Sequence, residues 1–132
     1  MSVFNSLIDQ SEVIEILKEA VKSAQKLNDS SQVMTNTWLF TGPPGSGRSN
    51  AAIAFAAALV CKEGGCSKCS DCMSTIIGTH ADVELIKTEG LSIKIDEIRE
   101  LISRASWAPS VASYRVVVIE DSDRLTESAA NA

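Results

Sequence analysis

The chain is organised around Trp38-Leu39-Phe40-Thr41-Gly42-Pro43-Pro44-Gly45-Ser46-Gly47-Arg48-Ser49, which an alanine-rich run over 50–60 follows. The apolar and aromatic residues predict a short buried strand over 37–41. The glycines and prolines predict a tight loop, and the alanines predict a close-packed helix. Strand, glycine-rich loop and helix in this order are the context that the phosphate-binding pattern G-x-x-x-x-G-K-[ST] requires.

The loop has most of the features of that pattern. Gly42 and Gly47 have the required spacing, and Ser49 occupies the position of the magnesium-binding hydroxyl. Arg48 stands where the pattern has lysine, and its longer planar fork is not equivalent to a compact ammonium. Glycines let backbone N–H groups converge on phosphates, and the start of the helix adds positive charge. The candidate nucleotide contacts in the loop are Gly42, Pro43, Pro44, Gly45, Ser46, Gly47, Arg48 and Ser49. The alternative is a plain turn between an unrelated strand and helix, which the spacing disfavours.

Composition restricts the class of protein. The 132 residues are 45% hydrophobic and 22% charged, as in a globular chain with room for one domain. No apolar run has the length of a membrane span, and residues 1–10 lack the pattern of a secretory signal, so we expect a cytoplasmic protein. The net charge of −5 disfavours a broad DNA-binding surface. Residues 125–132 have the pattern of a helix that has just begun, and we expect a truncated domain.

All four cysteines lie between residues 61 and 72, with the spacing C-x4-C-x2-C-x2-C: Cys61, Cys66, Cys69 and Cys72. In a cytosolic chain, clustered cysteines indicate metal binding rather than disulfides, and four thiolates suit tetrahedral zinc. Because a catalytic zinc keeps one position open, the complete set predicts a structural zinc knuckle inserted over 61–72. A redox-active C-x-x-C pair and an iron–sulfur cluster are the alternatives.

Hydrophobic periodicity predicts further helices. Asp9 and Glu12 have the spacing to cap a helix that extends to about residue 28, and shorter helices are expected over 71–77 and 92–106. In the helix over 92–106, the residues expected to face the core are Ile95, Ile98, Leu101, Ile102 and Ala105. The only histidine, His80, is expected in a turn, with a metal-ligand role as the lesser alternative.

Two more strands are expected, over 83–88 and 115–121. The second is a near-continuous apolar run, typical of a parallel strand buried on both faces. Glu120 and Asp121 end it, at the place where phosphate-loop proteins hold magnesium and prime the attacking water. The usual order in such ATPases is aspartate then glutamate, and here it is reversed. Asp121 contacting a metal and Asp121 capping the next turn both remain open.

The succession of these features resembles the clamp-loader subunits of bacterial DNA polymerase III. The resemblance covers residues 6–132. It rests on the glycine-rich loop and on the knuckle directly after the helix that follows this loop. It also rests on two sequence stretches: E-G-L-S-I-x-I-D-E-I-R over 89–99 and V-V-V-I-E-D-S-D-R-L-T-E-x-A-A-N-A over 116–132. The loop form G-P-P-G-S-G-R-S is similar to that of the delta-prime subunits. The related gamma/tau subunits normally keep lysine in the loop and Asp-Glu on the strand.

The resemblance implies an α/β fold: a P-loop NTPase domain of the AAA+ class, with a three-layer parallel sheet and an inserted four-cysteine zinc knuckle. It also implies partners, namely gamma/tau and delta subunits in a five-subunit ring that places the sliding clamp on primed DNA. Delta-prime subunits act mainly as stators and supply an arginine finger to a neighbouring ATP site. Arg48 and the reversed pair Glu120 and Asp121 fall where ATP chemistry is most demanding. We therefore expect no intrinsic ATPase activity and weak or absent binding of ATP and magnesium.

Two other functions are alternatives. One is a working gamma/tau-type ATPase in which Arg48 substitutes for lysine. The other is a zinc-containing DNA-binding module, which the acidic balance disfavours and which would have only Lys62 and Lys68 as basic residues near the knuckle.

Overall fold

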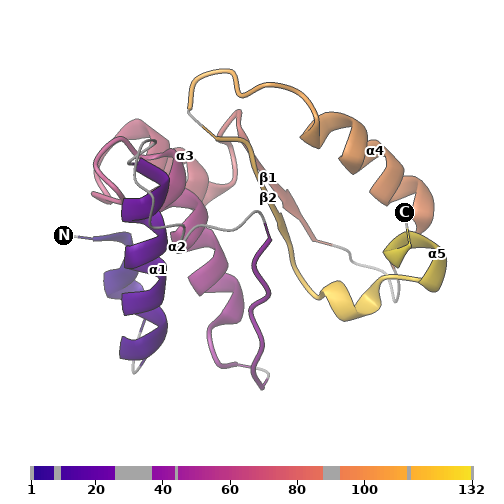
Figure 1. Cartoon of the computed structure of the whole chain (residues 1–132), viewed down its shortest axis with the longest axis horizontal. Coiled ribbons are helices and arrows are strands. Elements are labelled where there is room, and N and C mark those ends of the chain that lie inside the picture. The colour runs from indigo at the N-terminus through magenta and orange to yellow at the C-terminus, as the bar shows by residue number, and fades with distance from the viewer. Residues whose placement is uncertain are drawn as a thin grey trace. The chain divides into compact units, whose positions relative to one another are not determined.

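The computed structural model describes residues 2–7, 10–25, 37–43, 45–87, 93–112 and 114–131 (Figure 1). The chain divides into two compact units, Met1–His80 and Ala81–Ala132. In the described part of the chain, no helix is both long enough and apolar enough to cross a membrane.

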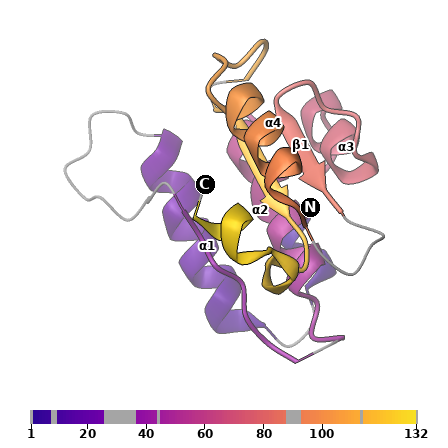
Figure 2. The ribbon, with the colours of Figure 1, turned by 90° about the vertical axis from the view of Figure 1, so that its right-hand side faces the viewer.

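The described elements of the first unit are helices: η1 (Val3–Ser6), α1 (Ser11–Gln25), α2 (Arg48–Val60) and α3 (Ser70–Ile77). α1 buries residues that recur at helical spacing: Leu17, Ala20, Val21 and Ala24. This stripe confirms the predicted amphipathic helix, and α1 lies beside α2 (Figures 1 and 2). Asp9 and residues 26–36, which include the predicted end of this helix, lie outside the described residues.

α2 is the centre of the first unit. It confirms the predicted alanine-rich helix and begins at Arg48, two residues before the expected start. Its alanines are almost completely buried: Ala54, Ala56, Ala57 and Ala58. Because a methyl side chain lets neighbouring backbones approach closely, η1, α1 and α3 all contact this one helix. α3 confirms the helix expected over 71–77.

The predicted strand over 37–41 is wrong for the described residues. Residues 37–41 are not assigned as a strand, and the described sheet consists of two strands that follow later in the chain. Aromatic packing holds the segment instead. The ring of Trp38 meets that of Phe55 in α2 edge-on at 5.2 Å between centroids, and the ring of Phe40 lies at 6.3 Å from Phe55. Leu39 points away and is exposed. Aromatic residues therefore anchor this segment on α2.

The second unit contains β1 (Val83–Ile86), α4 (Ile95–Ala105), β2 (Val116–Ile119), η2 (Ser122–Arg124) and α5 (Glu127–Ala130). β1 and β2 pair in parallel, with Val83 opposite Val116 and Ile86 opposite Ile119, which confirms a parallel α/β arrangement. Burial of β2 on both faces is not observed, because Val118 alone is buried and its neighbours are half-buried.

The core of the second unit lies between the sheet and α4. Ile93, Ile98 and Leu101 are buried, and the partly buried residues packed against them are Ile86, Ile95, Val117, Ile119 and Leu125. The expected core face of α4 is thus half right. Ile102 and Ala105 are exposed, because only the stripe of α4 that carries Ile98 and Leu101 packs against the sheet. Position 92, the expected start, lies outside the described residues.

Candidate functional site

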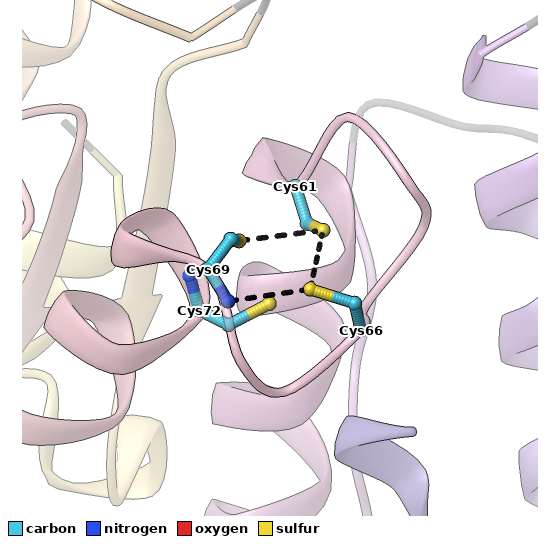
Figure 3. A group of neighbouring side chains, drawn as sticks. All are labelled: Cys61, Cys66, Cys69 and Cys72. Atoms are coloured by element: carbon cyan, nitrogen blue, oxygen red, sulfur yellow. Dashed lines mark hydrogen bonds between the residues drawn. The ribbon is translucent and has the colours of Figure 1, made fainter. Parts of the chain in front are cut away.

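The four cysteines come together where α2 ends and α3 begins, and we call them the four-thiol cluster (Figure 3). Cys61 caps the C-terminus of α2, where its N–H donates to the carbonyl of Ala57 at 3.0 Å. Cys69 is the N-cap of α3, and Cys72 lies in its first turn. Cys66 comes from the connecting loop. Two helix ends and one loop therefore place all four sulfur atoms within 4.8 Å of one another.

The sulfur positions match a tetrahedral metal site. The Sγ of Cys61 lies 3.8 Å from that of Cys66 and 3.6 Å from that of Cys69. Zn–S distances of about 2.3 Å in a tetrahedron give S···S edges of about 3.8 Å. Disulfide sulfurs lie at about 2.05 Å, and all four cysteines are free. The four thiols are thus close enough together to hold a metal ion.

The loop between the helices adopts conformations that favour small residues. Gly64 and Gly65 have φ of 76° and 106°, and Ser67 has φ of 65°. A Cβ on Gly65 would lie 2.6 Å from a methyl group of Val3, and the N–H of Val3 donates to the carbonyl of Gly65 at 3.0 Å. η1 therefore closes against the knuckle, and glycine is required at that contact.

Backbone N–H groups point at the sulfurs, as a site for thiolates requires. The N–H of Cys69 donates to Cys66 Sγ at 3.3 Å, and the N–H of Cys72 donates to Cys69 Sγ at 3.4 Å. Such donors, and the start of α3, stabilise negative charge on sulfur.

The pKa values of the thiols diverge within the cluster. Burial tends to raise the pKa of Cys61, but backbone hydrogen bonds from Cys66, Gly65 and Glu63 outweigh it and lower this pKa to about 7. Burial raises the pKa of Cys72, and the neighbouring Cys61 thiolate adds to the rise. Burial also raises the pKa of Cys69. The Cys61 thiolate thus forms readily, and a bound cation would stabilise the thiolates of Cys69 and Cys72 beside it.

His80 lies outside helix and strand, as expected for a residue in the turn after α3, and it is buried. Its side chain is 2% exposed, and its Nε2 lies 3.1 Å from Oδ1 of Asp71 in the first turn of α3. Its ring is therefore directed at a carboxylate that lies between two cysteines in the chain.

The glycine-rich loop turns sharply ahead of α2. The N–H of Ser46 donates to the carbonyl of Pro43 at 3.1 Å, and Gly45 and Gly47 have φ of 82° and 86°. Gly47 is the N-cap residue of α2, so the helix begins directly after the loop. A loop that leads into a helix N-terminus is the local arrangement that anion binding requires. Pro44 lies outside the described residues.

Side chains of this loop also lie close together. The Oγ of Ser46 is buried and has no hydrogen-bond partner among the described residues. A Cβ on Gly42 would lie 2.7 Å from that oxygen and 3.7 Å from Cδ of Arg48. Arg48 is half-buried, and Ser49 is exposed. The unpaired hydroxyl beside a glycine turn is compatible with an anionic ligand.

Glu120 and Asp121 follow β2 in the second unit. The N–H of Glu120 donates to the carbonyl of Ile86 at 2.9 Å, and its Oε2 lies 3.8 Å from Nζ of Lys87. Asp121 has φ of 53° and occupies the N-cap position of η2, but its side chain makes no capping hydrogen bond. Asp121 thus occupies the capping position that the sequence suggested as an alternative, but its side chain does not cap η2.

A further buried carboxylate, Asp82, has no counterpart in the sequence analysis. Its side chain is fully buried, and its two oxygens accept from the N–H groups of Ser110, Val111 and Ala112 at 2.5 to 2.8 Å. Nη1 of Arg115 lies 4.0 Å away. No local pattern could have indicated this, because the three N–H groups lie 28 to 30 residues further along the chain.

These features define a mixed α/β chain with a small parallel sheet and a four-cysteine cluster that could hold a metal ion. The chain belongs to the family described as DNA polymerase III, delta subunit, whose sequence model matches residues 10–132.

Several curated relatives carry related names. The chain is 33% identical to DNA polymerase III subunit delta' of Bacillus subtilis (strain 168) over 101 residues, which are 74% of this chain and 31% of that protein. It is 29% identical to the delta' subunit of Pseudomonas aeruginosa over 103 residues, 74% of this chain and 31% of that protein. It is 28% identical to the tau subunit of B. subtilis over 134 aligned positions, 98% of this chain and 22% of that protein. The chain thus spans a third or less of these relatives. No solved structure matches significantly.

Proposed function

We propose that this chain is the AAA+-type P-loop portion of a delta-prime-like clamp-loader subunit of DNA polymerase III, with the zinc knuckle over 61–72 inserted in it. The observation that carries the proposal is the family match over residues 10–132. The subunit would join gamma/tau and delta subunits in a ring of five, work in the cytoplasm, and help place the sliding clamp on primed DNA. Similarity to both delta' and tau subunits supports this kind of partner.

The metal in the knuckle is zinc in a structural role. The support is the chemistry and geometry of the four-thiol cluster, whose S···S distances of 3.6 and 3.8 Å agree with a Zn–S4 tetrahedron. Cys61, Cys66, Cys69 and Cys72 would be the ligands, so no coordination position is left for a substrate. When bound, zinc would hold the end of α2 and the start of α3 together.

The subunit does not hydrolyse ATP. Arg48 lacks the compact ammonium that reaches the outer phosphates, although its half-buried stem stays next to the loop. Glu120 forms an ion pair with Lys87. The order Glu120-Asp121 is also the reverse of the aspartate-glutamate order that is usual in ATPases of this kind. The loop residues Gly42 to Ser49 would then have a structural role, because they lead into α2 and hold its N-terminus in place.

The alternative is a gamma/tau-type ATPase. Two observations favour it: the similarity to tau extends over 98% of this chain, and the buried Ser46 hydroxyl is unpaired among the described residues. In that case Arg48 would contact phosphate, and Glu120 with Asp121 would serve magnesium and the attacking water.

A titration with a fluorescent ATP analogue and magnesium separates the two. For the non-hydrolysing subunit, we expect Arg48→Lys to bind the analogue at least about tenfold more tightly than the wild type, about 1.4 kcal/mol. Arg48→Ala is the matched control and should bind no better than the wild type. Tight wild-type binding that Arg48→Ala abolishes, together with ATP turnover that Asp121→Asn abolishes, would contradict the proposal and support the ATPase.

A further inference from the structure

His80 and Asp71 are connected by a partly buried hydrogen bond at the first turn of α3, the turn that carries Cys72 and that Cys69 caps. The His80 ring is 2% exposed, and the Asp71 carboxyl is 30% exposed. Since an ionised carboxylate only accepts hydrogen bonds, the Nε2–H of His80 is the donor. A single ring therefore fixes the direction of the Asp71 side chain from the protein interior.

Asp71 is held by its backbone as well. Its carbonyl accepts from Oγ1 of Thr75 at 2.7 Å and from Oγ of Ser74 at 3.3 Å, and Thr75 is completely buried. Asp71 lies between Cys69, the N-cap of α3, and Cys72, which is also completely buried. Any rotation of this first turn would move both cysteines.

The chain must reverse after α3 for this contact to form. α3 has eight residues and is thus about 12 Å long, yet His80, which follows its C-terminus, reaches a residue of its first turn. Gly78 makes the reversal in the left-handed conformation with φ of 82°, and the N–H of Thr79 donates to the carbonyl of Ser74 at 2.8 Å. The exit segment therefore turns back along α3, far enough for the His80 side chain to reach the first turn.

We propose that His80, through Asp71, is a positioning residue of the metal centre: the pair holds the first turn of α3 so that Cys69 and Cys72 face the same point as Cys61 and Cys66. The inference rests on the proposed zinc site. His80 is not a ligand here, because its ring nitrogen is committed to the carboxylate and the four sulfurs already form a complete set. Hydrogen-bonded partners of this kind orient metal ligands and typically change metal affinity about 10–100-fold.

The test is the rate at which the zinc-loaded chain gives up its metal to an excess of a chromogenic chelator. We expect His80→Leu to release zinc at least about tenfold faster than the wild type, at the low end of that range. His80→Gln keeps an amide N–H near the position of Nε2 and should restore a rate close to that of the wild type. The ligand-field bands of the Co²⁺-loaded chain should shift in His80→Leu and not in His80→Gln.

Asp71→Ala provides an independent variant at a partly exposed position, in case His80→Leu does not fold. It should release zinc as fast as His80→Leu, and the double variant should release it no faster than either alone, because both remove one interaction. Thr79→Ala is the matched local control, since its exposed Oγ1 makes only a 3.4 Å bond to Ser74. Leu17→Ala is the control for general loss of stability in the first unit.

The outcomes separate this inference from the proposed zinc site. A wild-type chain that takes up neither zinc nor cobalt overturns both. A wild-type chain that binds one zinc, with release rates and cobalt spectra unchanged in His80→Leu and Asp71→Ala, overturns the positioning role alone. Equal acceleration in Leu17→Ala and His80→Leu also overturns it, because release would then follow unfolding.

Discussion

Oδ2 of Asp82 accepts a hydrogen bond of 2.8 Å from the backbone N–H of Val111, although 29 residues separate the two. The N–H groups of the residues on either side, Ser110 and Ala112, donate to the same carboxylate. Three consecutive backbone N–H groups of the connection between α4 and β2 therefore bind one buried carboxylate. A three-donor arrangement of this kind satisfies a carboxylate that could not otherwise be buried.

We expect Asp82→Asn to lower the free energy of unfolding by about 2 kcal/mol, because an amide has one acceptor oxygen and its NH2 group would face backbone donors. Amide hydrogen exchange should report the loss locally, as reduced protection at residues 110–112. The control is Asp96→Asn, whose carboxyl is 89% exposed and should change stability by less than about 0.5 kcal/mol. Unchanged protection at residues 110–112 would contradict this account.

Metal removal should destabilise the first unit. With free zinc at about a thousand times its dissociation constant, binding adds about 4 kcal/mol to the folded state. Thermal unfolding with zinc, after a chelator, and after zinc is restored should show a fall and then a recovery of Tm. In the presence of zinc, the Cys66→Ser variant should have the same Tm as the chelator-treated wild type. A Tm that does not respond to the chelator would mean that the four thiols pack without a metal.

Gly65→Ala should be more destabilising than a similar change elsewhere. Its φ of 106° disfavours any side chain, and the new Cβ would lie 2.6 Å from Val3 and 3.2 Å from the Cβ of Ala58. Gly45→Ala is the matched control, since φ is 82° and nothing lies within 4 Å of the new Cβ. We expect about 1 kcal/mol for Gly45→Ala and about 1–3 kcal/mol more for Gly65→Ala, measured by urea unfolding. Adding Val3→Ala to Gly65→Ala should recover part of the loss, and a failure to do so would exclude the steric cause.

Phe55 should fix the segment ahead of the glycine-rich loop. It is 5% exposed and its ring contacts those of Trp38 and Phe40. We expect Phe55→Ala to cost about 3–5 kcal/mol and to shift the emission of Trp38 to longer wavelength. The measurement uses a Trp107→Phe background, because Trp107 is 61% exposed and would dominate the signal. Met73→Ala, at a 53% exposed position, is the control. Unchanged emission of Trp38 would show that another contact holds the segment.

Local patterns predicted what depends on neighbours in the chain. The spacing of the four cysteines within twelve residues predicted their convergence, since a loop between two helix ends needs no distant contact to bring them together. The alanine run predicted α2, and the apolar runs predicted two strands, the second of them parallel, where β1 and β2 lie. Propensity and periodicity suffice for such elements.

Residues whose partners lie far away in the chain were not predicted. His80 was expected in a turn, but its burial and its contact with Asp71, which follow a chain reversal at Gly78, were not predicted. No local sequence pattern indicated the buried role of Asp82. Segment 37–41 has the composition of a strand, but the described sheet consists of β1 and β2. Ile102 followed the helical period yet is exposed, because the width of the buried stripe depends on what packs against α4.

The sequence by itself determined the main helices, the strands β1 and β2, the thiol cluster and the family-like order of loop, knuckle and paired carboxylates, because each depends on residue type at short spacing. Only the tertiary structure decided which side chains support them: His80 and Asp71 at the thiols, Phe55 under Trp38, and Asp82 beneath the loop before β2. The physical reason is that burial and hydrogen bonding are satisfied by whichever groups the folded chain brings within reach. That choice depends on three-dimensional proximity and leaves no local mark in the sequence.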